Sequence, residues 1–136
     1  MNVSLVSAAT PEIEALWEHA VRDVVTKRGG PALLATLCGP LSESELLAEV
    51  VATASLWRVD DNGELRGFGL CRGGVVEAIY VDHAYRRQKA ATTLVRKLLA
   101  TSTPPSDAYA LPGDRAMKSL YESLGWKARL LTMRGA

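Results

Sequence analysis

The chain has 136 residues, a length that fits one domain with a single hydrophobic core. Hydrophobic residues make up 48% and charged residues 23%, which is close to a typical soluble globular protein and argues against a disordered chain. The formal net charge of +1 is too small to imply wholesale electrostatic attraction to nucleic acid or to an anionic membrane, although charge can still be clustered locally.

The two cysteines, Cys38 and Cys71, lie far apart in apolar or glycine-rich sequence, which favours buried free thiols over a metal site or redox pair. The N-terminus has no basic stretch leading into an apolar run, and no stretch of about eighteen consecutive apolar residues occurs. We therefore expect a cytoplasmic protein, monomeric or homodimeric, with no membrane partner.

The N-terminal part of the sequence predicts one strand followed by helices. Thr10 suits an N-cap and Pro11 the first helical position, and the pair Gly29–Gly30 suits the end of that helix. Ser42 and Glu45 have the spacing of a capping box, which opens another helix. The expected elements are an edge strand near 3–5, a first helix from 11 to the glycine pair, a short helix at 31–37 and a third helix from 43 to 51.

Strand patterns begin at Ser55. Asn62-Gly63 is a strong hairpin dipeptide, and Gly73-Gly74 marks a second turn. The segment 75–81 carries apolar residues on both faces, as central strands do, but Glu77 interrupts it. The remaining expected elements are strands at 56–59, 65–71, 108–111 and 126–133, and helices from about 86 to 100 and from 115 to 124. This order predicts a mixed α+β sandwich with a mainly antiparallel central sheet flanked by helices.

The turn between strand 75–81 and the following helix concentrates positive charge. Arg86, Arg87 and Lys89 precede the helix, although cations normally favour helix C-termini, where they complement the helix dipole. Free amides at a helix N-terminus bind phosphate or diphosphate, and the small Ala90 and Ala91 would let such a ligand approach the backbone. These features indicate an anionic ligand, and the alternative is a solvated basic turn that binds none. Nucleic-acid binding is not favoured, because no continuing basic stripe with interleaved aromatic residues follows.

Residues 78–94 resemble the GNAT superfamily of N-acetyltransferases, whose acyl-CoA motif is Arg or Gln, two residues, Gly, one residue, then Gly or Ala. Arg86 matches the first position and Ala91 the last, whereas Lys89 stands where the family usually has glycine. A second match lies in 111–126, where Tyr121 is followed after three residues by Gly125 and Trp126.

This resemblance implies how acetyl-CoA would bind. The backbone of Ile79, Tyr80 and Val81 would pair with the pantetheine arm as with an added strand. The diphosphate would be held by Arg86 and by the amides of the loop and first helical turn, which comprise Arg87, Gln88, Lys89, Ala90, Ala91 and Thr92.

Two catalytic candidates follow from the same resemblance. Tyr121 matches a tyrosine that commonly protonates the departing thiolate, and its alternative role is packing beside Leu120 and Leu124. Glu77 matches a glutamate of polyamine acetyltransferases and could take a proton from the incoming ammonium, whose pKa is about 10. Its alternative role is an ion pair with Arg58, Arg66 or Arg72.

Other candidates are weaker. His83 and His19 suit surface positions, and Trp57 and Trp126 suit core positions better than a substrate pocket. A non-glycine residue in the first helical turn needs no special dihedral angles, so we expect an outward-pointing Lys89 that assists acetyl-CoA binding.

The resemblance implies an N-acetyltransferase that moves acetyl from acetyl-CoA to a primary amine of a small molecule or protein by direct attack. The alternative is a non-catalytic domain that binds acyl-CoA as a sensor or subunit.

Overall fold

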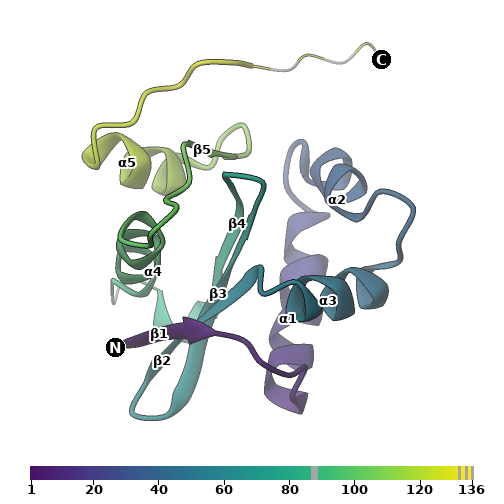
Figure 1. Cartoon of the computed structure of the whole chain (residues 1–136). Coiled ribbons are helices and arrows are strands. Elements are labelled where there is room, and N and C mark those ends of the chain that lie inside the picture. Colours follow the sequence, from purple (N-terminus) through teal and green to yellow (C-terminus); the bar gives the residue numbers. More distant parts are fainter. Residues whose placement is uncertain (87–88, 132, 134, 136) are drawn as a thin grey trace.

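The computed structural model describes residues 1–86, 89–131, 133 and 135 (Figure 1). The elements in chain order are β1 (Asn2–Leu5), α1 (Pro11–Val24), α2 (Gly30–Cys38), α3 (Glu43–Ala52), β2 (Leu56–Asp61), β3 (Glu64–Arg72), β4 (Val75–Val81), a 3₁₀ turn η1 (His83–Tyr85), α4 (Ala90–Leu99), β5 (Asp107–Ala108) and α5 (Arg115–Ser123). No helix in the described part of the chain is long and apolar enough to cross a bilayer.

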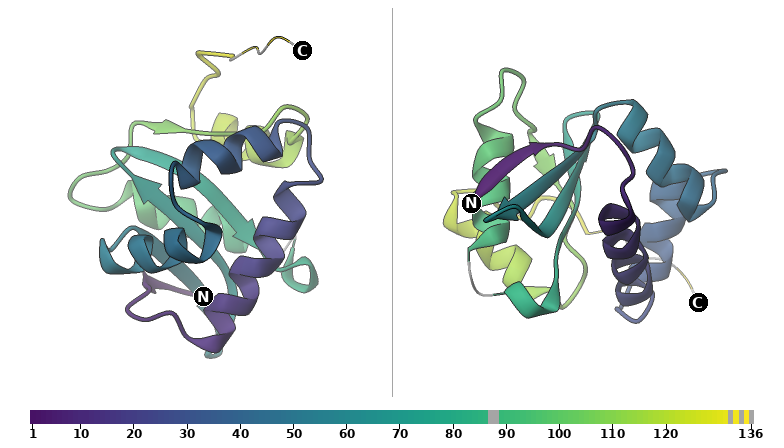
Figure 2. Two further views of the ribbon diagram at one scale, coloured as in Figure 1. Left: turned by 90° about the vertical axis from the view of Figure 1, so that its right-hand side faces the viewer. Right: turned by 90° about the horizontal axis from the view of Figure 1, so that it is seen from below.

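The strands form one five-stranded sheet in the order β1-β2-β3-β4-β5, antiparallel except for the parallel pair β4–β5. Helices α1, α2 and α3 cover one face, and α4 and α5 lie on the other (Figures 1 and 2). The predicted α+β class with a mainly antiparallel sheet is therefore confirmed.

The expectation of a single hydrophobic core is wrong, because each face of the sheet has its own core. The larger core lies under α1–α3 and includes the fully buried Ile13, Leu46 and Val50. The smaller one lies under α4 around Leu94, which is also fully buried. Gly69 permits this close approach of α4, because a Cβ there would lie 3.0 Å from Leu94 Cδ2.

Several local predictions are confirmed. Ser42 and Glu45 make both reciprocal bonds of the capping box at the start of α3. The β2–β3 hairpin turns at Asn62 and Gly63, which have φ of 52° and 78° as a tight hairpin requires. Both cysteines are free thiols, and burial raises the pKa of each.

Two helix boundaries differ from prediction. α1 ends at Val24, because the following residues form a separate turn and the glycine pair starts α2 instead. α4 begins at Ala90 rather than near Arg86, because η1 and a left-handed residue, Lys89, come first.

The strands after α4 are shorter than predicted. β5 comprises only Asp107 and Ala108, and the predicted strand at 126–133 is wrong for the described residues there. A strand needs a neighbouring backbone, and the free edge of a two-residue β5 offers almost none. Leu130, Leu131 and Met133 are accordingly exposed.

Candidate active site

Strand β4 changes its surroundings halfway along its length. Val75 and Val76 pair with β3 on one side and with β5 on the other. From Ala78 to Val81 only β3 is a partner, since β5 has ended. The C-terminal half of β4 therefore leaves a backbone edge without a strand beside it in the described structure.

A β-bulge marks the point of change. Leu70 pairs with Ala78 and Cys71 with Val76, so Glu77 is the extra residue of β4. Bulges bend a strand, increase its twist and re-aim side chains. The bulge therefore explains both why β5 parts from β4 here and why Glu77 faces the helices of the larger core.

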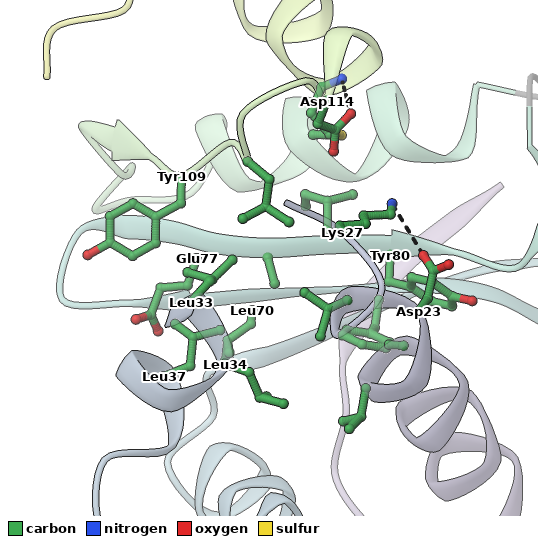
Figure 3. A pocket seen from close by; sticks show the side chains of 18 of the residues that line it. Asp23, Lys27, Leu33, Leu34, Leu37, Leu70, Glu77, Tyr80, Tyr109 and Asp114 are labelled. Carbon is green, nitrogen blue, oxygen red and sulfur yellow. Dashed lines mark hydrogen bonds and ion pairs between the residues drawn. The ribbon is translucent and has the colours of Figure 1, made fainter. Parts of the chain in front are cut away.

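Glu77 lines a pocket of about 120 Å³ between α1, α2, the open half of β4 and the segment after β5 (Figure 3). Three aromatic residues form a row along it: the ring centroids of Trp17 and Phe68 are 5.5 Å apart, and those of Phe68 and Tyr80 are 5.9 Å apart. Most of the remaining wall is aliphatic, contributed by Ala20, Val21, Val24, Leu33, Leu34, Leu37, Leu46, Leu70, Ala78, Ile79, Ala110, Leu111 and Met117.

Glu77 is paired with Arg72, which is the ion pair considered in the sequence analysis. Arg72 Nε donates to Glu77 Oε1, and Arg72 Nη2 donates to the Leu37 carbonyl at 2.9 Å. The side chain of Glu77 is only 13% exposed, and its hydrogen bond raises the pKa of Arg72. Glu77 thus both lines the pocket and belongs to an ion pair.

A second charged group at the pocket was not foreseen from the sequence. Asp23, at the end of α1, lies 3.3 Å from Lys27 Nζ, 3.7 Å from Arg86 Nη2 and 3.8 Å from His83 Nε2. Burial, and next the charge of Asp23, raise the pKa of the neighbouring Tyr80. This cluster ties the loop after β4 to α1.

Arg86 lies against the end of β4. Its Nε donates to the Val81 carbonyl at 3.0 Å, and its guanidinium lies 5.5 Å from the Tyr80 ring centroid. The predicted cofactor residues Arg87 and Gln88 lie outside the described residues. Ile79 and Val81 pack on the α4 side of the sheet, and Tyr80 faces α1.

The N-terminus of α4 has no capping side chain among the described residues. Thr10, Ser42 and Asp114 each accept a bond at the start of α1, α3 and α5, whereas α2, like α4, has no side-chain cap. The first-turn amides of α4 therefore have no side-chain acceptor, which is the arrangement that anion-binding helix ends use.

Lys89 departs from our expectation about its backbone. It has φ of 67° and ψ of 14°, in the left-handed region, so the prediction of ordinary helical angles is wrong. A glycine at this position would adopt this conformation without the steric cost that a Cβ brings. Of the small residues that follow, Ala90 is buried in the α4-side core, and Ala91 and Thr92 are half-buried.

Tyr121 is buried in α5 and stacks on Trp126, with ring centroids 5.6 Å apart. It is not one of the residues that line the described pocket. Burial, followed by the negative charge of Asp114, raises its pKa well above the usual range, so the phenol keeps its proton.

Comparison with known proteins decides the family. A family model described as an acetyltransferase (GNAT) domain matches residues 26–132. The chain belongs to the GNAT acetyltransferase family. No curated protein sequence matches it.

Solved structures of other GNAT proteins share the fold. The aminoglycoside 6'-N-acetyltransferase AAC(6')-IG from Acinetobacter haemolyticus aligns with a TM-score of 0.55 and 18% identity, covering 100% of this chain and 97% of its own. AAC(6')-Iy, in complex with the bisubstrate analogue CoA-S-monomethyl-acetylneamine, has a TM-score of 0.55 and 14% identity over 99% and 97%. A ribosomal-protein-alanine N-acetyltransferase from Brucella melitensis has a TM-score of 0.52 and 18% identity over 98% and 100%.

Of the remaining sequence candidates in this GNAT fold, the two histidines and Trp57 lie where they were expected, and Trp126 stacks on Tyr121 outside both core clusters. His19 is exposed, and the His83 side chain is 66% exposed. Trp57 packs against the α4-side core, and neither Trp57 nor Trp126 lines the described pocket. Among the described residues, no group of three or more His, Cys, Asp or Glu side chains is placed to hold a metal ion.

The pocket aromatics were missed by sequence reasoning. Trp17 shares its helical spacing with ordinary core residues of α1, and only tertiary contact places it beside Phe68. A sequence signal did exist for Asp23, which is an acidic residue in the last turn of α1, where it opposes the helix dipole.

Proposed function

We propose that this protein transfers an acetyl group from acetyl-CoA directly to a primary amine, without a covalent enzyme intermediate. The observation that supports this most strongly is the position of Glu77. A bulge turns this carboxylate into an apolar pocket, at the residue where the open edge of β4 begins.

In this proposal the open edge of β4 receives the pantetheine arm. The backbone of Ile79, Tyr80 and Val81 supplies hydrogen bonds as to an added strand. The uncapped amides of Ala90, Ala91 and Thr92 at the start of α4 hold the diphosphate, together with Arg86, Arg87, Gln88 and Lys89 from the preceding loop.

The amine enters from the α1–α2 side, where the pocket lies. Glu77 accepts a proton from the ammonium, and the free amine attacks the thioester carbonyl carbon. A C–N bond forms, the C–S bond breaks, and Tyr121 gives a proton to the departing thiolate. The nitrogen loses its second proton as the amide forms, and this proton returns through solvent to the Tyr121 phenolate. The raised pKa of Tyr121 supports this role only in keeping the proton in place until the thiolate appears.

The pairing of Glu77 with Arg72 favours a second candidate, a non-catalytic acyl-CoA-binding domain. An ion-paired carboxylate is held as a structural partner. The presence of Lys89 in place of the family glycine also favours this second candidate. Both candidates need acetyl-CoA binding, and only the first needs turnover.

Two measurements on the purified chain separate the candidates. Thermal unfolding is followed with acetyl-CoA, CoA and ATP, since a ligand that binds only the folded state raises its melting temperature. Thiol release from acetyl-CoA is then followed with a panel of amines. A shift with acetyl-CoA and no thiol release supports the binding domain, and no shift with acetyl-CoA or CoA contradicts both candidates.

A further inference from the structure

The pocket that holds Glu77 is small. Its volume of about 120 Å³ is comparable to that of an engineered apolar protein cavity of roughly 150 Å³ that accepts benzene. One ring or one branched alkyl group fits such a space, whereas a molecule of several linked sugar rings would have to leave most of its rings outside it.

The wall of this pocket is aromatic along one side. Trp17, Phe68 and Tyr80 form the row described above, and α2 adds Leu33 and Leu34 opposite the sheet. Aromatic edges and faces pack favourably against another ring, and aliphatic side chains bury it from water. This wall suits an apolar group better than hydroxyls, which would lose their hydrogen bonds to water there.

Each carboxylate that lines the described pocket already has a partner, so none is left to bind the additional ammonium groups of a polycation. Asp23 has Lys27, Arg86 and His83 around it, and Glu77 has Arg72. Asp114, the third carboxylate, caps α5 by accepting from the Met117 amide at 3.1 Å. Figure 3 shows Glu77 with Leu33, Leu37 and Tyr109 at one end, and Asp23 with Lys27 at the other.

We propose that the acceptor is a primary monoamine whose body is a single aromatic or branched aliphatic group. Its amine lies near Glu77 at the open edge of β4, and its body lies along the row of Trp17, Phe68 and Tyr80. A polyamine or an aminoglycoside would bring additional ammonium groups into an apolar wall whose carboxylates already have partners, and would lose their hydration without compensation. This assignment rests on the proposed acetyl transfer.

The test ranks three amines on the wild-type protein: 2-phenylethylamine, ethanolamine and neamine. Turnover is measured as thiol release from acetyl-CoA, and binding is measured separately by isothermal titration with CoA present. We expect kcat/KM for 2-phenylethylamine to exceed that for the other two by at least about tenfold, because only its ring gains from burial in the pocket.

A matched pair of variants places the effect in the pocket. Leu34 lines it, and Leu65 is a half-buried leucine of the same core that does not. Leu34→Asn should lower the preference for 2-phenylethylamine over ethanolamine by about fivefold or more, and Leu65→Asn should leave this ratio unchanged. If Leu34→Asn fails to fold, Leu34→Ala replaces it, and the wild-type ranking still decides.

The two proposals fail differently. Neamine or ethanolamine used as well as 2-phenylethylamine overturns the acceptor assignment and leaves acetyl transfer intact. Binding of 2-phenylethylamine without any thiol release supports the pocket assignment and contradicts catalysis. Absence of 2-phenylethylamine binding overturns the assignment outright.

Discussion

The two halves of β4 have the same neighbour on one side and different neighbours on the other. Val75 and Val76 lie between β3 and β5, and Val76 is fully buried. Ala78 to Val81 keep β3 but have no strand on the β5 side among the described residues, and Ala78, Ile79 and Tyr80 line the pocket. One seven-residue strand thus supplies both a structural interior and an open edge.

This difference teaches that a single extra residue separates the buried half of β4 from the half with the open edge. Glu77 is that residue, and a bulge interrupts the pairing locally while the strand continues. If this interpretation holds, substitutions before Glu77 should affect stability, and those at or after Glu77 should affect chemistry and ligand binding.

The largest effect is expected at the boundary itself. Glu77→Gln removes a proton acceptor and keeps the side-chain size, so kcat/KM at neutral pH should fall about 100-fold, within the usual range for general bases. The loss should shrink toward pH 10, where amines deprotonate unaided. Steady-state rates from pH 6 to 10, with acetyl-CoA affinity measured separately, check this.

Arg72→Gln is the matched control, because it breaks the same ion pair and leaves the carboxylate. It should retain most of the activity. Equal losses in both variants at every pH, with lowered melting temperatures, would identify the Arg72–Glu77 pair as structural.

The closed half of β4 should respond through stability instead. Val76→Ala removes two fully buried methyl groups and should lower the free energy of unfolding by about 2 kcal/mol. Urea denaturation measures this, and the acetyl-CoA affinity of the folded protein should not change. Tyr80→Phe, in the open half, is the comparison, and it should lower the free energy of unfolding by less than about 1 kcal/mol. A reversed order would break the distinction between the halves.

The sequence anticipated much of this strand but not its neighbours. The apolar run 75–81 with Glu77 inside it was identified because strand periodicity and a buried carboxylate are local features. The Arg72 pair was one of three considered, since only the register selects among Arg58, Arg66 and Arg72. The cluster at Asp23 was not foreseen, because it joins residues about 60 positions apart in the sequence.

Later elements were predicted less well for a physical reason. The alternating residues of 126–133 have strand propensity, but propensity alone does not provide an edge to pair with. The length of β5 could not be predicted from its own sequence either, because the end of β5 depends on the bulge in β4. The fold class survived these errors, since helix caps and hairpin turns fix the rest locally.

Tyr121 tests whether the chemistry extends beyond β4. Tyr121→Phe keeps the ring on Trp126 and removes the hydroxyl, so turnover should fall about tenfold or more while acetyl-CoA affinity stays constant. Measuring kcat and the CoA dissociation constant together checks this prediction. Unchanged turnover from pH 6 to 10 would leave Tyr121 a packing residue.

The same tyrosine also predicts a pH dependence of stability. Its pKa is raised in the folded protein, whereas an unfolded tyrosine ionises near pH 10. Its contribution is therefore fully present below about pH 10 and is lost as the pH rises above that value. Between pH 8 and pH 10.5, the urea midpoint should fall further for wild type than for Tyr121→Phe. An identical fall in both proteins would show that Tyr121 does not contribute to this loss of stability.

The smallest effect is expected at Lys89, where the chain departs from its family. Its backbone is in the left-handed region, which costs roughly 1–2 kcal/mol for any residue with a Cβ. Glycine avoids this cost, but it also gives the unfolded chain more conformational entropy, which cancels part of the gain. Lys89→Gly should therefore stabilise the protein by about 0.5–1 kcal/mol in urea denaturation. Lys89→Ala is the matched control, because it removes the charge and keeps the strained backbone, so it should not stabilise.

Acetyl-CoA binding separates charge from backbone at the same position. An outward lysine beside a diphosphate attracts it through a charge that salt screens. Both Lys89→Ala and Lys89→Gly should then bind CoA several-fold more weakly than wild type at low ionic strength and nearly equally at high salt. Dissociation constants of the three proteins at two salt concentrations decide the matter. Tighter binding by Lys89→Gly at both concentrations would mean that the lysine obstructs the ligand, because relief of the obstruction does not depend on salt, and it would favour the non-catalytic candidate.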